Sequence, residues 1–156
     1  MAKEIERKYK VLDCIELDKY PYVEIKQGYL SVDPKKTVRI RIKDNKAFLT
    51  IKGKSEGIER DEFEYAIPIE DAIQMLKMTP HKIYKRRYLV QHKNHLWEVD
   101  IFEDQNQGLR IAEVELSKAN EEVELPNWVG EEVSEDIRYF NSQLCLNPYC
   151  NWTSNK

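Results

Sequence analysis

Along most of this chain, apolar and polar residues alternate with a period of two. Successive side chains of a β-strand point to opposite faces of the sheet, so this alternation is typical of strands with one apolar and one polar face. Short clusters of Gly, Pro, Asn and Asp separate the alternating segments and indicate turns. The pattern predicts eight strands, over residues 3–11, 24–32, 37–43, 46–52, 59–67, 82–91, 95–103 and 110–117.

The clearest pair of strands is a hairpin formed by TVRIRIK (37–43) and KAFLTIK (46–52). Asp44 and Asn45 between them fit a tight turn. The other turns are also short, which favours antiparallel pairing, because parallel neighbours need long crossover connections. Eight antiparallel strands are enough to close a barrel. The expected fold class is therefore α+β, predominantly antiparallel β, with an eight-stranded closed β-barrel and flanking helices.

Two segments break the period of two and are predicted to be helices. After Pro68, IEDAIQMLK (69–77) has apolar residues at helical spacing. A C-terminal amphipathic helix is expected to begin at Ser134, a residue type that caps helices. Its inward side chains would be Ile137, Phe140 and Leu144. The acidic stretch 118–133 before it is predicted to be irregular.

The composition fits one globular domain over residues 1–156. Apolar residues make up 41% of the chain and charged residues 34%, which is above the usual quarter. However, 25 basic and 28 acidic residues leave a formal net charge of only −3. A global positive field for nucleic acid is therefore not expected.

Cysteine usage and hydropathy point to the cytoplasm. The three cysteines lack a CxxC spacing, which fits neither a disulfide framework nor a zinc site. The charged N-terminus lacks the apolar core of a secretory signal, and no apolar run approaches the roughly 20 residues of a membrane helix. No membrane partner is expected. If the predicted barrel closes incompletely, its exposed strand edges would favour a homodimer.

The charged residues fall on one face of the predicted strands, and their signs differ from strand to strand. Strands 37–43 and 46–52 are basic, whereas 95–103 and 110–117 are acidic. A solvated surface normally mixes the two signs. This face carries Glu4, Glu6, Lys8, Lys10, Arg39, Arg41, Lys43, Thr50, Lys52, Arg60, Glu62, Glu64, Lys85, Arg87, Glu98, Asp100, Glu113 and Glu115.

Two interpretations of this charged face are open. In an ordinary sandwich or barrel, the interior is apolar and the charges face water. Alternatively, the charged face lines a central cavity, in which case the charges must be paired or ligated. Carboxylates two residues apart, such as Glu4 and Glu6, are suitable ligands for Mg²⁺ or Mn²⁺, and clustered Arg and Lys side chains bind phosphate oxygens. Such a cavity would suit a polyphosphate chain carrying divalent cations.

The blocks that carry these charges resemble the CYTH superfamily, the triphosphate tunnel metalloenzymes. EIERK (4–8) matches the family's E-x-E-x-K signature. Further resemblances follow in family order and span nearly the whole chain: RIR (39–41), LTIKG (49–53), RDEFE (60–64), KRR (85–87), WEVDIF (97–102), AEVEL (112–116) and WVGEEVSEDIRYFNSQL (128–144). The resemblance implies a single CYTH domain, an eight-stranded antiparallel tunnel with inward charges, and metal-dependent work on triphosphates.

The resemblance also implies roles for individual residues. The phosphates would be gripped by Lys8, Arg39, Arg41, Lys52, Lys85 and Arg87. The metal ions would be held by Glu4, Glu6, Asp100, Glu113 and Glu115, and the catalytic residues would be Glu4, Glu6 and Lys8. Supporting roles would fall to Arg60, Glu62, Glu64 and Glu98. Because Glu98 and Asp100 share a face, either could be the ligand that their strand provides.

The expected activity is hydrolysis of inorganic triphosphate to pyrophosphate and phosphate, with about two ions of Mg²⁺ or Mn²⁺ as cofactors. One ion would bridge phosphate oxygens, and the other would polarise the attacking water near Glu4 and Glu6. The alternatives are a class IV-type adenylate cyclase that converts ATP to cyclic AMP and pyrophosphate, a thiamine or nucleoside triphosphatase, and a non-catalytic polyphosphate-binding module. In each case the partner is a small molecule that carries a chain of phosphates.

Overall fold

The computed structural model describes residues 3–152 of the 156-residue chain. The strands in this part are β1 (Lys3–Val11), β2 (Tyr22–Ser31), β3 (Lys36–Lys43), β4 (Lys46–Gly53), β5 (Glu59–Ile67), β6 (Lys82–His92), β7 (His95–Phe102), β8 (Arg110–Glu115) and β9 (Val129–Glu132). The α-helices are α1 (Ile69–Lys77) and α2 (Asn141–Leu144), and single 3-10 turns occur at Leu17–Lys19, Asp104–Asn106, Ile137–Tyr139 and Tyr149–Asn151. No helix within residues 3–152 has the length and apolar character needed to cross a membrane.

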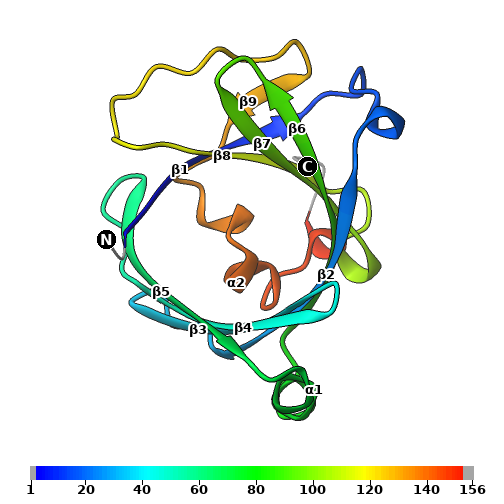
Figure 1. Cartoon of the computed structure of the whole chain (residues 1–156), viewed down its shortest axis with the longest axis vertical. Helices are drawn as coiled ribbons and strands as arrows, with labels where there is room; N and C mark the ends of the chain where they lie inside the picture. The colour runs from blue at the N-terminus through cyan, green and yellow to red at the C-terminus, as the bar shows by residue number, and fades with distance from the viewer. Residues whose placement is uncertain (1–2, 153–156) are drawn as a thin grey trace.

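Eight of the strands close into a barrel, as the sequence predicts. Neighbouring strands follow the order β5-β4-β3-β2-β6-β7-β8-β1, and a further pairing between β5 and β1 completes the ring. All of these pairings are antiparallel. Figure 1 looks into the ring, with α1 outside it and α2 within its outline. The predicted fold class is therefore confirmed.

β1 is the strand that closes the barrel. Its first residues pair with β5, where Lys3 lies opposite Asp61. Its middle pairs with β8 on the other side, and its last residues also pair with β9. Because β1 and β5 pair, the described barrel is closed and offers no open seam as a reason for dimerisation. The homodimer stays a prediction.

The apolar face of the barrel points outward and is covered by α1 and by loops. α1 packs Ala72 and Leu76 against the outer face of β3 and β4. A larger cluster covers β1, β6, β7 and β8, with the fully buried Trp97 among its members. The Trp97 ring contacts those of Tyr9 and Trp128 at centroid distances of 5.5 and 5.6 Å. Burial of this face leaves the opposite, charged face of each strand for the interior.

One end of the barrel interior is apolar and is filled by the C-terminal segment, residues 137–152. Ile83, Phe102 and Ile111 lie on the inner face of β6, β7 and β8 and are almost completely buried. Tyr139 and Leu144 of the C-terminal segment pack against them. Figure 1 shows this segment inside the outline of the barrel. The charged side chains therefore face only the remaining part of the interior.

The structure corrects the prediction that 118–133 is irregular. Residues Val129–Glu132 form β9, in which Glu132 lies opposite Tyr9 of β1. The strand is short and its sequence, VGEE, does not alternate between apolar and polar residues, so no periodic signal marked it.

The prediction that a helix begins at Ser134 is also wrong. The Ser134 hydroxyl accepts a hydrogen bond from the backbone N–H of Lys8 (2.9 Å) and donates one to the Glu132 carboxylate (2.6 Å). It therefore joins the C-terminal segment to β1 instead of capping a helix. The chain turns at Ile137–Tyr139 and becomes helical only in α2, and the Ile137 side chain, expected to face inward, is 63% exposed.

Gly28 of β2 lies on the outer face of the barrel, in close contact with the end of α1 and the residues that follow it. A Cβ at this position would lie 2.8 Å from both Leu76 Cδ2 and Thr79 Cγ2. We expect Gly28→Ala to lower the free energy of unfolding by about 1–3 kcal/mol, as overpacking of a tight contact does. Urea unfolding followed by circular dichroism measures this. The control is Gly53→Ala, whose Cβ would meet nothing closer than Asp61 Cβ at 3.6 Å; equal destabilisation by both substitutions would contradict the packing described here.

Candidate functional site

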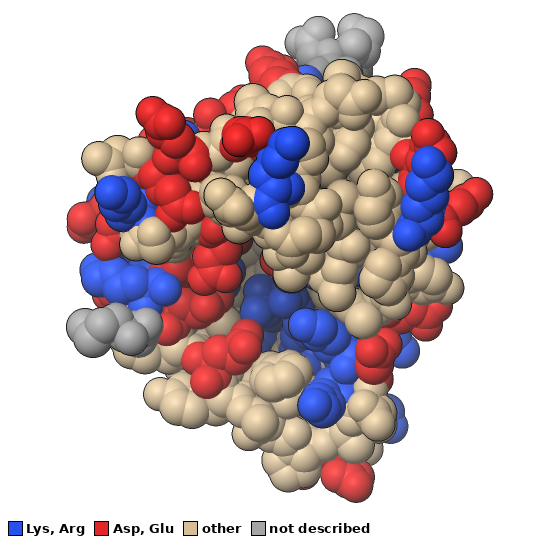
Figure 2. Space-filling view, turned by 45° about the horizontal axis from the view of Figure 1, so that its top comes forward, with Lys and Arg blue, Asp and Glu red and all other residues tan. Residues whose placement is uncertain are grey.

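The barrel encloses a charged cavity of about 210 Å³ that opens to solvent. Figure 2 shows the opening as a hollow, with Lys and Arg at its back and Asp and Glu along one side. The cavity is lined by Glu4, Glu6, Lys8, Tyr29, Thr37, Arg39, Arg41, Lys43, Lys52, Arg60, Glu62, Glu64, Lys85, Arg87, Glu98, Glu113, Glu115, Phe140, Asn141 and Ser142. Every residue predicted for the site is in this lining except Asp100. The charged face of the strands is thus the inner face, and the interpretation with an apolar interior and charges in water is wrong.

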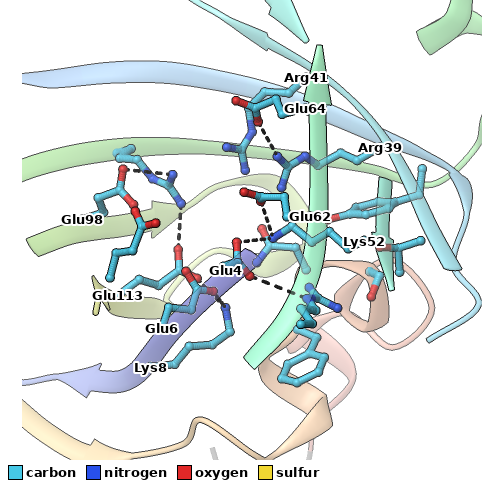
Figure 3. Close-up of a pocket in the computed structure, with 18 of the residues that line it drawn as sticks. Glu4, Glu6, Lys8, Arg39, Arg41, Lys52, Glu62, Glu64, Glu98 and Glu113 are labelled. Carbon is cyan, nitrogen blue, oxygen red and sulfur yellow. Dashed lines mark hydrogen bonds and ion pairs between the residues drawn. The ribbon is translucent and has the colours of Figure 1, made fainter. Parts of the chain in front are cut away.

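Glu6, Lys8 and Glu113 form the centre of the acidic side of the cavity. β1 and β8 are in register, so that Lys8 lies opposite Glu113, and Glu6 opposite Glu115. The Lys8 ammonium donates hydrogen bonds to Glu6 Oε1 (3.0 Å) and to Glu113 Oε2. Figure 3 shows these three side chains together at one side of the cavity. The Lys8 ammonium therefore lies between the buried Glu113 and the partly buried Glu6.

The negative charges of these two carboxylates are unequally balanced. Burial, followed by repulsion from Glu113, raises the pKa of Glu6 to about 8. Burial would raise the pKa of Glu113 as well, but Lys8 and Arg87 hold it well below its usual range. Glu6 is therefore the carboxylate without a full counter-charge, and an additional cation on this side would stabilise its ionised form.

Glu4 connects the acidic strand β1 to basic residues at the seam of the barrel. Its Oε2 accepts a hydrogen bond from Lys52 Nζ (2.8 Å), and its Oε1 lies 3.6 Å from Arg60 Nε. Lys52 Nζ also lies 3.5 Å from Glu62 Oε2, on the residue opposite it in β5. Burial alone would raise the pKa of Glu4, but Lys52 lowers it to about 2. Glu4 is therefore ionised and holds both cations where β1 meets β5.

Arg39 lies on the basic side, on β3. Its Nη2 donates to Thr50 Oγ1 (3.1 Å) and, more weakly, to Glu64 Oε2 (3.5 Å). These partners follow one another across β3, β4 and β5 in register. Among the described residues, the buried Nε of Arg39 has no hydrogen-bond partner. A buried donor without a partner is costly, so this guanidinium is suited to an acceptor that enters the cavity.

Arg41, two residues further along β3, is buried and makes no ion pair with any carboxylate in residues 3–152. Its Nε donates to the neutral side-chain oxygen of Gln27 (2.8 Å). Burial, followed by the charges of Arg39 and Arg87, lowers the pKa of Arg41 to about 9. An anion placed beside it would remove this imbalance of charge.

Lys85 and Arg87 of β6 share the carboxylate of Asp100. Arg87 donates from Nε and Nη2 to the two Asp100 oxygens (2.8 and 2.9 Å), and Lys85 Nζ donates to Oδ2 (2.7 Å). Arg87 Nη2 also reaches Glu113 (2.8 Å), and Nη1 lies 3.3 Å from Glu98. Asp100 is only 1% exposed and lies behind these cations, outside the cavity lining. Its contacts orient Lys85 and Arg87, and its role as a metal ligand stays a prediction.

Carboxylates also lie toward the open end of the cavity. The side chains of Glu64, Glu98 and Glu62 are 44%, 34% and 27% exposed, compared with 16% for Glu6. Burial, followed by the charges of Glu4 and Glu98, raises the pKa of Glu115. The acidic side thus extends from the partly buried Glu6 outward to solvent.

Three residues beside the cations escaped the sequence analysis. Gln27 and Tyr29 lie on one face of β2, and their spacing of two was the available signal. Asn141 comes from the C-terminal segment, whose irregular path carries no periodic signal. Its side-chain oxygen accepts hydrogen bonds from Gln27 Nε2 (3.1 Å) and Lys85 Nζ (2.9 Å). The C-terminal segment therefore forms part of the cavity wall.

The acidic side of the cavity fits a hard divalent cation. Carboxylate oxygens are the ligands that Mg²⁺ and Mn²⁺ prefer, and Glu6 lacks a full counter-charge. In the part of the chain that the structure describes, no three carboxylate, imidazole or thiol side chains converge to form a complete metal cage. Mg²⁺ commonly needs no such cage, because one or two carboxylates, water and substrate phosphates complete its shell. The donor set therefore fits a cation that binds together with a phosphate ligand.

Known proteins with similar sequences and structures include enzymes that act on triphosphate. The sequence model of the CYTH domain matches residues 2–143. The inorganic triphosphatase of Acetivibrio thermocellus is 44% identical over 154 residues, which cover 97% of this chain and 99% of that protein. The inorganic triphosphatase of Nitrosomonas europaea is 32% identical over 149 residues, or 92% and 97% of the two chains. A crystal structure of the inorganic triphosphatase NE1496 superposes with a TM-score of 0.67 at 31% identity, over 94% of this chain and 96% of that one.

The imbalance at Glu6 predicts that this residue destabilises the metal-free protein. The pKa of Glu6 is about 8 in the folded protein, above its ordinary value of 4.5. The folded state therefore holds the Glu6 proton more tightly than the unfolded state, and the protein loses stability as the pH rises from 4.5 to 8. Glu6→Gln removes the charge and keeps the shape. In EDTA at pH 8, we expect it to raise the unfolding free energy by about 1 kcal/mol, or the thermal midpoint by roughly 2–4 °C.

The gain should shrink as the pH is lowered toward 4.5, because Glu6 is then protonated in both states. Differential scanning calorimetry across this pH range is the measurement. Glu70→Gln, on the exposed surface of α1, controls for the change in net charge. A Glu6→Gln protein less stable than wild type at pH 8 would refute the raised pKa.

Proposed function

This chain belongs to the CYTH domain family, and on that premise we propose that it is a metal-dependent phosphohydrolase that cleaves inorganic triphosphate to pyrophosphate and phosphate. Two relatives aligned over nearly its whole length are inorganic triphosphatases. The observation that carries the proposal is the division of one cavity into two complementary sides. The basic side contains Arg41 without a carboxylate partner, and the acidic side contains Glu6 without a full counter-charge. A phosphate chain carrying a divalent cation would supply an anion to Arg41 and a cation to Glu6.

The size of the cavity favours inorganic triphosphate over larger substrates. Its volume of about 210 Å³ is below the roughly 300–1,000 Å³ of pockets that enclose drug-sized ligands. ATP or thiamine triphosphate would have to leave its organic part outside this cavity. Adenylate cyclase and thiamine or nucleoside triphosphatase activity are therefore the alternatives, and inorganic triphosphate is the proposed substrate.

The proposed cofactor is Mg²⁺ or Mn²⁺, with about two ions per site. When bound, the ions would supply Lewis-acid chemistry, which polarises the phosphoryl oxygens and the attacking water. The proposed ligands are Glu4, Glu6, Glu113 and Glu115, together with Asp100 or Glu98 from β7. Ligation would compensate the repulsion between Glu6 and Glu113 that the protein alone leaves partly unbalanced.

The basic residues would bind and orient the phosphate chain. Arg39 and Arg41 offer donors from β3, and Lys85 and Arg87 offer donors from β6, which only β2 separates from β3. Guanidinium groups suit this task because they present paired donors to phosphate oxygens. Lys52, held by Glu4, would complete the grip near the seam.

The proposed role of Lys8 is to stabilise charge on the phosphoryl group that is transferred. Burial would lower its pKa, but Glu113 and Glu6 raise it, so the ammonium stays charged. Phosphoryl transfer demands little covalent chemistry from a protein, and catalysis comes mainly from positioning and electrostatic stabilisation. We therefore assign catalysis to Glu4, Glu6 and Lys8, with support from Arg60, Glu62 and Glu64.

Glu6→Gln tests the catalytic assignment. We expect its phosphate release from tripolyphosphate, with Mg²⁺ or Mn²⁺, to fall by about 10²–10³, as loss of a charged transition-state partner does. A colorimetric phosphate assay measures it, and EDTA should abolish the wild-type activity. Glu70→Gln, far from the cavity on α1, should retain full activity. Retention of full activity by Glu6→Gln would exclude the proposed role.

Resolving the products separates the candidate functions. Tripolyphosphate, ATP and thiamine triphosphate are incubated separately with the wild-type protein and each metal, and the products are resolved by ion-exchange chromatography. We expect pyrophosphate and phosphate from tripolyphosphate to form fastest. Cyclic AMP from ATP would establish the cyclase instead, and tight tripolyphosphate binding without turnover would establish a binding module.

Arg41→Ala tests the basic side. Since Arg41 is buried and has no carboxylate partner, we expect its loss to raise KM, lower kcat and reduce kcat/KM by about 10²-fold. Steady-state kinetics with tripolyphosphate supply both constants. Arg86→Ala is the matched control, because Arg86 lies on the same basic strand as Arg87 but outside the cavity lining. Similar kinetics for the two variants would remove Arg41 from the substrate site.

A further inference from the structure

We propose that Gln27 and Asn141 are positioning residues. Gln27 orients Arg41 through a neutral amide, so that the positive charge of Arg41 stays available to the substrate, and Asn141 orients Lys85 without adding a second negative charge to that of Asp100. This inference rests on the proposed function, because it concerns how the same cavity holds triphosphate. It adds two residues to the site, one of them from the C-terminal segment.

Gln27 is positioned to fix the Arg41 guanidinium. The two residues lie directly opposite each other in the β2–β3 register. The Gln27 side chain is fully buried, and its oxygen accepts the hydrogen bond from Arg41 Nε (2.8 Å). This contact uses only the inner donor of the guanidinium. The four outer N–H donors of Arg41 remain for other partners.

Asn141 is positioned to fix the Lys85 ammonium. Its side-chain oxygen accepts from Lys85 Nζ (2.9 Å), and Asp100 accepts a second hydrogen bond from the same nitrogen (2.7 Å). An ammonium group has three donors, so one remains for a ligand in the cavity. Asn141 oxygen also accepts from Gln27 Nε2 (3.1 Å), which joins both amides into one chain of hydrogen bonds from Arg41 to Lys85.

The neutral amide of Gln27 distinguishes Arg41 from the neighbouring cations, Lys85 included. Lys52 is held by Glu4, Lys8 by Glu6 and Glu113, and Arg87 by Asp100, all carboxylates. A carboxylate bonded to Arg41 would also fix its direction, but would cancel much of its attraction for phosphate. Gln27 supplies direction without that loss of charge. For Lys85, which already has Asp100, Asn141 supplies a second fixed contact without a second negative charge.

The test is Gln27→Glu, which keeps a hydrogen-bond acceptor for Arg41, adds a charge, and loses the Nε2 donor to Asn141 and Tyr29. Its matched control is Gln74→Glu, the same substitution on the exposed surface of α1. Tripolyphosphate binding is measured by isothermal titration calorimetry in EDTA, so that neither turnover nor metal enters the result. We expect Gln27→Glu to raise the Kd at least about tenfold over the control. Its thermal midpoint should stay close to that of wild type, because the counter-charge that Arg41 gains offsets the lost hydrogen bond to Asn141.

Two further variants separate charge from packing. Asn141→Asp adds a charge beside Lys85 and should weaken binding in the same way as Gln27→Glu. Gln27→Leu removes the hydrogen bonds without adding charge, and its Kd should rise by less, about threefold to tenfold. With metal present, Gln27→Glu should raise KM more than it lowers kcat. A purely structural role for the amide would instead lower the thermal midpoint and leave the Kd of the folded protein unchanged.

The outcomes for this inference and for the proposed function are distinguishable. A Kd for Gln27→Glu within twofold of the Gln74→Glu control overturns the inference, whether or not the wild type hydrolyses tripolyphosphate. Equal weakening by Gln27→Glu and Gln27→Leu also overturns it, because charge would then play no part. A wild type that binds tripolyphosphate without hydrolysing it overturns only the proposed function. A wild type that binds tripolyphosphate neither in EDTA nor with Mg²⁺ or Mn²⁺ overturns both.

Discussion

The structure depends on opposite charges that pair across neighbouring strands inside a closed barrel. Ionised side chains are costly to bury, and each is tolerated because its register partner or a nearby strand supplies the other sign. Lys8 lies opposite Glu113, and Arg87 opposite Asp100. The backbone pairing that closes the barrel therefore also places the functional groups. Where the pairing is incomplete, at Arg41 and Glu6, the remaining charge specifies a ligand that is anionic on one side and brings a cation to the other.

The C-terminal segment gives the barrel interior its two different ends. Leu144 and Tyr139 fill the apolar end together with Ile83, Phe102 and Ile111. Asn141, between them in sequence, reaches the cations of the charged part. One short stretch thus supplies both an apolar seal and a polar wall. The charged cavity therefore occupies only part of the barrel interior, beside the apolar end that this segment fills.

Most of the barrel and of its inner face could be predicted from local patterns. In TVRIRIK, strict alternation marks a strand, and the segregation of Arg and Lys from the acidic strands indicated that this polar face lines a cavity. The position of a side chain along the barrel axis could not be predicted. Glu98 and Asp100 both lie on the inner face of β7, but only Glu98 reaches the cavity. The Ser134 hydroxyl bonds a strand 126 residues away, so no local rule could distinguish it from a helix cap. Asn141 was missed for the same reason, since its partners lie on β2 and β6.

The closure of the barrel by β1 has a consequence for the order of folding. Lys8 and its partner Glu113 are 105 residues apart, and Lys52 and Glu4 are 48 apart. Contacts between distant parts of a chain form slowly, because the entropy of closing the long loop is lost before the contact compensates it. The local hairpins β3–β4 and β6–β7 can form much earlier. We therefore expect the carboxylates of β1 to remain hydrated until these long-range pairings form, so that the acidic half of the cavity is completed late in folding.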